Sequence, residues 1–174
     1  MAHRCVYHHW IQGVSGPGKI EIAKPYIDWD HVWSHTAALP SYIRESMFLF
    51  NQRLLLTKLR CHRFDNKTDP SCPICKTAPE TDEHLMLECP SRTEIRRWLE
   101  ETIRRLGCGT PPEDFIRGHL GKIANPRTAF TLVAAYVYST WTERSRQKVP
   151  LRSEIERLWV SIRPTSANLN RPQS

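Results

Sequence analysis

Four residues in one short segment have the types and spacing of a metal site. Cys72, Cys75, His84 and Cys89 follow the pattern C-P-I-C-x8-H-x4-C. Thiolate and imidazole groups are the ligands that tetrahedral Zn²⁺ takes in structural sites, among them the Cys₃His class. With four ligands and no fifth candidate nearby, the pattern predicts a closed, structural zinc site that leaves no open position for a reactive water. The alternative is two unrelated pairs of buried cysteines.

The residues between the ligands predict how this segment folds. Two residues separate Cys72 from Cys75, a spacing that lets a tight turn point both thiolates at one ion. Thr81 lies in an acidic run and is the predicted N-cap of a short helix that carries His84. Cys89 directly precedes Pro90, so it must lie where that helix ends.

Helical periodicity dominates the rest of the chain, and no segment shows the alternation that is typical of a strand. We expect helices over residues 28–38, 41–50, 57–63, 91–106, 113–118, 125–141 and 153–162. A capping box from Ser91 to Glu94 opens the fourth of these, and Gly107 closes it. The helix after Asn125 and Pro126 is apolar on most of its circumference, which predicts a central place in the core. The fold class is therefore mainly α: a small helical domain stapled by a Cys₃His zinc knuckle.

The sequence assigns faces to two of these helices. Ser41 caps the second helix, one face of which is formed by Tyr42, Ile43, Met47 and Phe50. An apolar stripe on the fourth helix faces the core and consists of Ile95, Trp98, Leu99, Thr102, Ile103 and Leu106. Arg97 and Arg104 point the opposite way. They face either a phosphate backbone or the glutamates four residues away on the same helix.

The chain has the length and composition of a single domain. Its 174 residues, 40% of them hydrophobic, are enough to bury one core. We expect one helical domain over residues 28–163, with the metal segment at 72–89. Glycine and proline punctuate residues 1–27, which predicts an irregular arm, and the polar residues 164–174 are predicted to be a disordered tail.

Neither a membrane span nor a signal peptide is apparent in the sequence. It has no run of about 18 apolar residues, and its first residues lack the apolar centre of a signal peptide. We therefore expect no membrane association and an intracellular location, in the nucleus or the cytoplasm. Clustered cysteines in such a compartment more often bind metal than form disulfides.

The net charge of +7 is unevenly distributed along the chain. A basic balance favours a polyanionic partner such as nucleic acid. Residues 71–90 have a net charge of −3, whereas residues 40–70 have +3 and residues 144–174 have +5. Nucleic acid is therefore expected to contact the helices beside the metal segment and the tail. The residues predicted to bind it are Lys58, Arg60, Arg63, Arg97 and Arg104.

Other chemical motifs in the sequence are weak or missing. Residues 13–20 fit the start of a phosphate-binding loop, but Ile20 replaces the Ser or Thr that holds Mg²⁺. A second metal site near the N-terminus would use His3, Cys5, His8 and His9, although terminal histidine-rich stretches are usually just exposed. Motifs of hydrolases, zinc proteases and polymerases are missing, so we expect no enzymatic activity from this chain.

From Trp29 to about Leu106, the order of motifs resembles the zinc-binding region that follows the reverse transcriptase domain in LINE-type (non-LTR) retrotransposon proteins. The specific part of the resemblance is Cys72-Pro73-Ile74-Cys75, then Glu80-Thr81, His84-Leu85 and Cys89. Weaker matches are Trp29 and Trp33 before Pro40, Arg44-Glu45, residues 56–60 ahead of Arg63-Phe64, residues 69–71, and Ile95-Arg96. Retroviral nucleocapsid knuckles also use Cys₃His, but they place the histidine closer to the second cysteine.

The resemblance implies a domain that holds template RNA or target DNA near a polymerase during target-primed reverse transcription. The polymerase and endonuclease motifs themselves are absent from this sequence. We therefore expect a non-catalytic accessory domain with Zn²⁺ as its cofactor, and with nucleic acid and a polymerase domain or another protein as its partners. The alternative is a protein-interaction scaffold, retained by a host, in which the zinc is purely structural.

Overall fold

The structure, a computed structural model, describes residues 23–163 of the chain. Within that range every regular element is a helix, which confirms the predicted mainly α fold, and the one strand-like pairing there is an isolated bridge between Ser71 and Pro79. The predicted tail and most of the predicted arm lie outside the described residues. The loop-like sequence at 13–20 and the N-terminal histidine cluster also lie outside them.

Seven α-helices and two short helical turns make up the described part of the chain. The helices are α3 (Trp29–Ala37), α4 (Ser41–Asn51), α5 (Lys58–Phe64), α6 (Thr93–Arg105), α7 (Pro112–Phe115), α8 (Pro126–Ser145) and α9 (Arg152–Ile162). Between α5 and α6 lie a π-helical turn, η1 (His84–Glu88), and a 3₁₀ turn, η2 (Pro90–Arg92). In the range that the structure describes, no helix is long and apolar enough to cross a bilayer.

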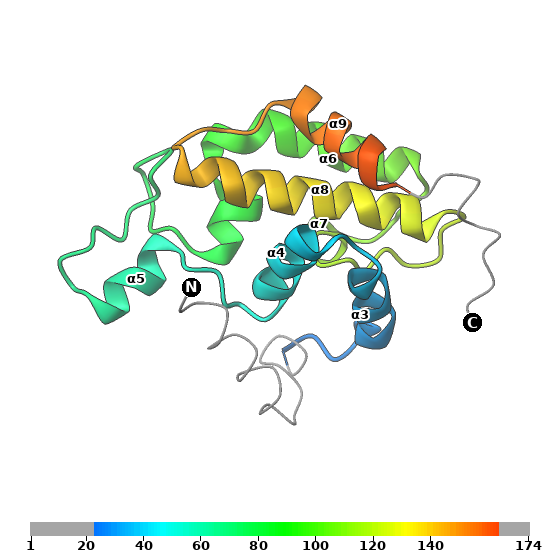
Figure 1. Ribbon diagram of the computed structural model, residues 1–174, viewed down its shortest axis with the longest axis horizontal. Coiled ribbons are helices and arrows are strands. Elements are labelled where there is room, and N and C mark those ends of the chain that lie inside the picture. The colour runs from blue at the N-terminus through cyan, green and yellow to red at the C-terminus, as the bar shows by residue number, and fades with distance from the viewer. Residues whose placement is uncertain (1–22, 164–174) are drawn as a thin grey trace.

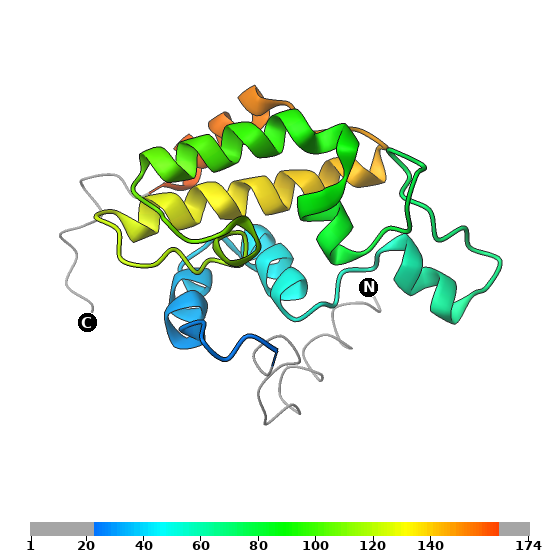
Figure 2. The same ribbon diagram turned by 180° about the vertical axis from the view of Figure 1, so that it is seen from behind.

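Helix α8 lies at the centre of the fold, as its sequence predicts. It packs against α4, α6, α9 and η1 and runs through the middle of the molecule in both views (Figures 1 and 2). Leu132 and Tyr136 are fully buried on one side of α8, and Phe130, Val133 and Val137 are buried on the other. A helix that is apolar on all sides can be stable only when it is surrounded by protein in this way.

The structure corrects the prediction for the face of α4. Ile43, Met47 and Phe50 are buried as expected, but Tyr42 is 47% exposed and meets the ring of Tyr138 edge-on. Tyr42 immediately precedes Ile43, and consecutive residues of a helix point about 100° apart, so both cannot face the core centre. Pro40, and not Ser41, occupies the N-cap position.

Capping residues mark the ends of three helices, and the start of α6 differs from the prediction. The side chains of Asp28 and Thr57 cap α3 and α5, and Gly107 follows α6 with a φ of 93°. The predicted capping box at Ser91 is wrong, because residues 90–92 form the turn η2 and α6 begins at Thr93 without a side-chain cap. Pro90 cannot donate a backbone hydrogen bond but fits the first position of such a turn, which explains the later start.

Candidate metal centre

The first two predicted ligands lie on a tight hairpin. The backbone N–H of Lys76 donates to the carbonyl of Cys72 at 3.0 Å, and the N–H of Cys72 donates to the carbonyl of Ala78 at 2.8 Å. Lys76 has a φ of 60°, a left-handed conformation that closes the turn. This geometry turns the side chains of Cys72 and Cys75 toward the same point.

The other two ligands lie at the ends of η1. The hydroxyl of Thr81 accepts a hydrogen bond from the N–H of His84 at 2.8 Å, so Thr81 caps this turn as the sequence predicts. Cys89 follows the last residue of η1, and Pro90 prevents the turn from continuing. The turn is π-helical and not α-helical, and the N–H of Cys89 donates to the carbonyl of His84 at 2.8 Å.

The four predicted ligands converge in space. Their three Sγ atoms and one imidazole nitrogen all lie within 4.8 Å of one another. The Sγ atoms of Cys72 and Cys89 are 4.0 Å apart, and the Sγ of Cys75 is 3.3 Å from Nε2 of His84. With Zn–S bonds of about 2.3 Å, neighbouring sulfur atoms of a tetrahedral site are about 3.8 Å apart. The donor set and its spacing therefore fit one tetrahedral zinc ion.

The cysteines of this cluster differ in acidity. Burial raises the pKa of Cys89 to about 11. Burial also acts to raise the pKa of Cys75, but hydrogen bonds from Thr77 and the neighbouring Cys72 and His84 outweigh it and lower that pKa to about 6. Because thiolates and not thiols bind metals, a metal ion that binds here displaces the proton of Cys89.

Glu80 attaches the metal segment to two helices. Its side chain is fully buried and pairs with Arg144 near the end of α8, from Nε to Oε1 at 2.8 Å and from Nη2 to Oε2 at 2.6 Å. Oε2 also accepts a hydrogen bond from the backbone N–H of Lys58 at 2.7 Å, and the carbonyl of Glu80 accepts one from Leu59 at 3.3 Å. One residue thus fixes the start of α5 and the end of α8 to the metal segment.

Further contacts join η1 to the rest of the fold. Glu83 pairs with Arg53 at 3.1 Å and with Arg117 at 3.2 Å. The hydroxyl of Tyr136 on α8 donates to the carbonyl of Met86 at 2.8 Å, and Met86 is buried in the core. The cluster therefore lies between the helical body and α5.

Ion pairs and burial account for most of the acidic side chains in the metal segment. Of its four acidic residues, Glu80 and Glu83 are paired with arginines and Asp82 is buried. Glu88 is the one that lies exposed. The net charge of −3 that the sequence assigns to residues 71–90 is therefore mostly neutralised by ion pairs or buried, and little of it lies on the surface.

The predicted nucleic-acid-binding residues do not form a single group. Lys58, Arg60 and Arg63 lie on α5, at the end of the molecule beyond the last turn of α8, whereas Arg97 and Arg104 are exposed on α6 (Figure 1). The guanidinium of Arg60 donates to the carbonyl of Arg53 and is partly committed to the fold. None of these five side chains forms an ion pair with any residue in the described range.

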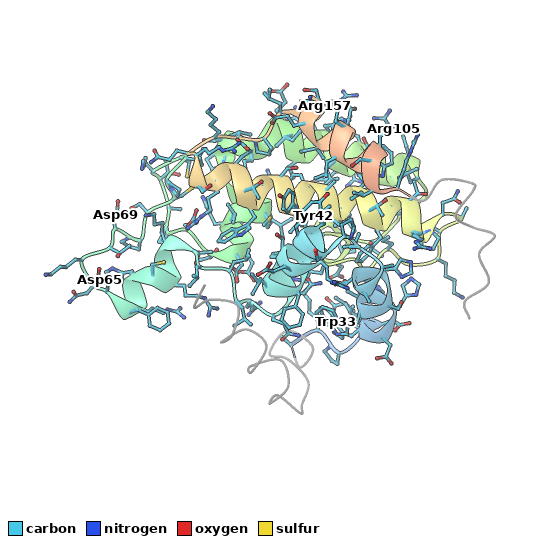
Figure 3. The ribbon with its side chains drawn as sticks, in the orientation of Figure 1. Trp33, Tyr42, Asp65, Asp69, Arg105 and Arg157 are labelled. Atoms are coloured by element: carbon cyan, nitrogen blue, oxygen red, sulfur yellow. The ribbon has the colours of Figure 1, made fainter. Side chains whose placement is uncertain are left out.

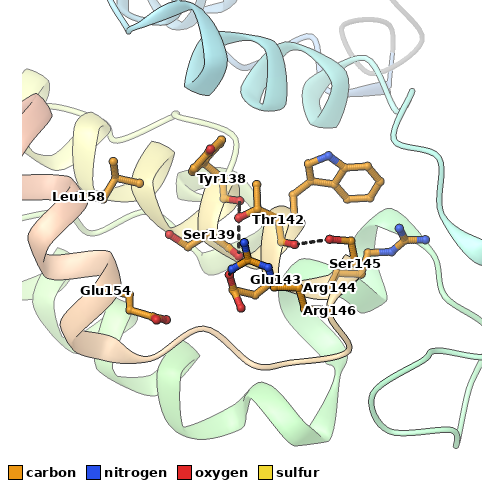
Figure 4. A pocket seen from close by; sticks show the side chains of 10 residues that line it. Tyr138, Ser139, Thr142, Glu143, Arg144, Ser145, Arg146, Glu154 and Leu158 are labelled. Carbon is orange, nitrogen blue, oxygen red and sulfur yellow. Dashed lines mark hydrogen bonds and ion pairs between the residues drawn. The ribbon is translucent and has the colours of Figure 1, made fainter.

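A cavity of about 570 Å³ opens beside the last turns of α8, but each of its charged side chains already has a bonding partner within the fold. Figure 4 shows these side chains, which belong to Glu143, Arg144, Arg146 and Glu154. Arg146 pairs with Glu143 at 2.7 Å, and the carboxylate of Glu154 accepts a hydrogen bond from the N–H of Leu151 at 2.9 Å. With Arg144 bound to Glu80, the cavity offers no unpaired cation to a ligand.

Sequence comparison agrees with the geometry of the cluster. Residues 19–95 match the family described as zinc-binding in reverse transcriptase, which confirms the resemblance seen in the motifs. This segment contains all four residues of the cluster, while α7, α8 and α9 lie beyond its end. Searches among curated proteins and among solved structures each found no match.

Proposed function

Because residues 19–95 match the reverse-transcriptase zinc-binding family, we propose that the cluster holds one structural Zn²⁺ and that the chain binds nucleic acid beside it. In this proposal the domain is an accessory to a polymerase of retrotransposon type and catalyses nothing by itself. The bound zinc supplies a cross-link between the hairpin at residues 72–75 and η1. Glu80, next to the Thr81 cap, then fixes the start of α5 to the zinc-bound segment through its hydrogen bond with the backbone N–H of Lys58.

The observation that carries the nucleic-acid proposal is a set of cations without acidic partners around α5. Within the described range, Lys58, Arg63 and Lys67 form no ion pair. Two acidic residues follow α5 and would be their natural partners, but these accept backbone hydrogen bonds instead. Asp65 accepts from the N–H of Lys67 at 3.1 Å, and Asp69 accepts from the N–H of Ser71 at 2.9 Å. The cations are therefore free to contact phosphate groups.

The arrangement of this region suits a long polyanion. We call α5 and the loop after it, residues 57–70, the α5 arm. The arm extends away from the helical body, and Asp65 and Asp69 lie near its outer edge (Figure 3). A protruding basic element reaches a nucleic-acid backbone without a clash from the rest of the fold. Specific sequence readout is no part of this proposal, because phosphate contacts position a protein and do not read bases.

The salt dependence of binding tests this proposal. We expect the zinc-loaded chain to bind RNA or DNA with an affinity that falls steeply as salt rises, by about 0.7 to 0.9 in log–log slope for each phosphate contact. Replacing Lys58, Arg63 and Lys67 together with glutamine should weaken binding to every sequence and reduce this slope. The matched control replaces Arg97, Arg104 and Arg105, three exposed arginines of α6, with glutamine.

Each outcome of this comparison has a definite meaning. If the α6 variant loses more affinity than the α5 variant, the interface lies on α6. If the unmodified chain does not bind nucleic acid even at low salt, the nucleic-acid proposal is wrong. The second candidate function is then a protein-interaction scaffold, which the exposed Leu56 and Phe64 favour because they place apolar side chains at both ends of α5.

A further inference from the structure

The α5 arm exposes an aromatic ring among its cations. Phe64, the last residue of α5, is 80% exposed. The other phenylalanines of the chain are buried (Phe50, Phe115 and Phe130) or half-buried (Phe48). A single exposed apolar residue is common on protein surfaces, but this one adjoins Arg63 and lies near Lys67, which have no acidic partners. An aromatic face beside free cations is the arrangement with which proteins bind unpaired bases.

We propose that Phe64 stacks on an unpaired base and that the α5 arm therefore prefers single-stranded over double-stranded nucleic acid. This inference rests on the proposed function and specifies its ligand. Arg63 and Lys67 would contact the phosphates on either side of the stacked base. A duplex keeps its bases stacked on one another, so it offers Phe64 no free ring face and binds through phosphates alone.

Variants at Phe64 test the inference in the zinc-loaded full chain. We expect Phe64→Leu to weaken binding to a single-stranded oligouridine by about 5- to 150-fold, the range that stacking on one base supplies. Phe64→Trp should preserve binding. Neither change should affect binding to a duplex or to an abasic strand of equal length, because those ligands present no free base. Tyr42→Leu, on α4, is the matched control for loss of an exposed aromatic ring.

The outcomes separate this inference from the proposed function. If Phe64→Leu binds the single strand as tightly as the unmodified chain does, the stacking inference is overturned while the nucleic-acid proposal stands. Equal weakening of single-strand and duplex binding would overturn the stacking inference in the same way. If the unmodified chain binds neither ligand, the proposed function itself fails. Binding of a protein partner that is lost in Phe64→Leu would point to the scaffold instead.

A separate observation concerns a buried cation beside the metal cluster. Arg92 is 1% exposed, and all three of its guanidinium nitrogens are buried without a hydrogen-bond partner in the described range. Its backbone N–H donates to the carbonyl of Cys89 at 3.0 Å, so the turn η2 holds its backbone against the last ligand, three residues earlier in the chain. An unpaired buried charge is strongly unfavourable, so this arrangement calls for a nearby negative charge.

The metal-loaded cluster would supply that charge. Three thiolates and one neutral imidazole around Zn²⁺ have a net charge of −1. We infer that Arg92 is the counter-charge of the zinc-loaded cluster. It is then a positioning residue that raises zinc affinity without contacting the metal. This inference rests on the proposed zinc binding.

The inference predicts that removing the charge of Arg92 weakens zinc binding but stabilises the zinc-free protein. We expect Arg92→Met to weaken zinc binding by about 10- to 100-fold, the usual effect of losing a residue that supports metal ligands. The same change should raise the melting temperature of the chelated, reduced protein, because it removes an unpaired buried charge. Zinc affinity is measured by competition with a chromophoric chelator. Arg96→Met is the matched control, because Arg96 already pairs with Glu100 at 3.8 Å.

A second pair of variants separates charge from volume. Arg92→Lys keeps the positive charge and Arg92→Gln removes it, so the lysine variant should bind zinc more tightly than the glutamine variant. Equal zinc affinity in these two variants would overturn the inference. It would also be overturned if Arg92→Met shifted the melting temperatures of the chelated and zinc-loaded proteins equally. If the unmodified chain takes up no zinc, the proposed function fails and not the role of Arg92 alone.

Discussion

The carboxylate of Glu80 and the guanidinium of Arg144 are joined by two hydrogen bonds, at 2.8 and 2.6 Å, although 64 residues separate them in sequence. Arg144 also donates to the carbonyl of Leu56 at 3.0 Å and lies over the ring of Trp141. Glu80 belongs to the segment that matches the zinc-binding family, and Arg144 lies beyond it. Helix α8, which lies beyond residue 95, is therefore bonded directly to the segment that holds the metal cluster.

Breaking this ion pair should destabilise the protein strongly. Removing one partner of a buried pair leaves the other charge uncompensated and costs about 3–5 kcal/mol. We expect Glu80→Gln and Arg144→Met each to lower the unfolding free energy by an amount of this order. The double variant should lose less than the sum of the two, because the second change removes the unpaired charge that the first one leaves.

Chemical denaturation of the zinc-loaded protein measures this cycle. The control is Arg146→Met, which breaks an exposed pair with Glu143 and should change the unfolding free energy by about 1 kcal/mol or less. Strict additivity of Glu80→Gln and Arg144→Met would show that the two side chains do not depend on each other.

Asp82 should make the protein less stable at neutral pH than at moderately acidic pH. Burial, with a further contribution from Glu83, raises the pKa of Asp82 from 3.8 to about 6 in the folded protein. The folded chain thus binds this proton more tightly than the unfolded chain does. The contribution of Asp82 to stability falls as the pH rises from about 4 to about 6 and remains low above that.

Asp82→Asn tests this sign. At neutral pH the variant should be more stable than the unmodified chain, by up to about 3 kcal/mol for a shift of this size. The advantage should shrink as the pH falls below 6, with zinc in excess throughout. Asp69→Asn is the control. A hydrogen bond from the backbone of Ser71 lowers the pKa of Asp69, so this variant should be less stable than the unmodified chain at neutral pH. A variant less stable than the unmodified chain at neutral pH would contradict the prediction.

Gly118 cannot be replaced without strain. Its φ is +97°, and a Cβ atom at this position would lie 2.3 Å from Cε2 of Phe130, inside the core. Overpacking and the left-handed backbone together should make Gly118→Ala less stable by about 2–5 kcal/mol. Gly109→Ala is the matched control, because no atom lies within 4 Å of its Cβ position. Thermal unfolding should show a large shift for the first variant and almost none for the second.

Removing zinc should unfold part of the protein and not all of it. The side chains that surround α8, among them Ile43, Phe50 and Leu99, form a core that does not include the cluster. Residues 57–82 have few such contacts and depend on the hairpin and on Glu80. Hydrogen exchange after chelation should therefore lose protection in residues 57–82 while α8 stays protected. Uniform loss of protection, or none, would show that the metal does not order this segment specifically.

The sequence predicts the features that depend on neighbouring residues. These features include the ligand spacing, the Thr81 cap, the end of α6 before Gly107 and the all-round burial of α8. Each follows from residues a few positions apart. The predicted capping box at Ser91 is wrong because a capping box and a 3₁₀ turn that begins at Pro90 compete for the same residues. The structure resolves that competition in favour of the turn.

Contacts between distant residues could not be predicted in this way. Glu80 appears in the sequence as one acid of an acidic run, and nothing local indicates its bond to Arg144. Arg92 and Arg117 appear as surface cations, yet both are buried. Their burial depends on how η2 and the turn after α7 pack against the body. The predicted pairs on α6 also differ, since the pair that forms there is Arg96 with Glu100.

Native mass spectrometry of the full chain with a single-stranded oligonucleotide of about 20 nucleotides tests the central claim most directly. One spectrum reports the zinc count and the oligonucleotide count of every species. We expect one zinc ion per chain and oligonucleotide bound to the zinc-loaded species, with both lost in Cys72→Ser. Metal-free chains that bind the oligonucleotide equally well would contradict the claim that zinc orders the α5 arm for nucleic-acid binding.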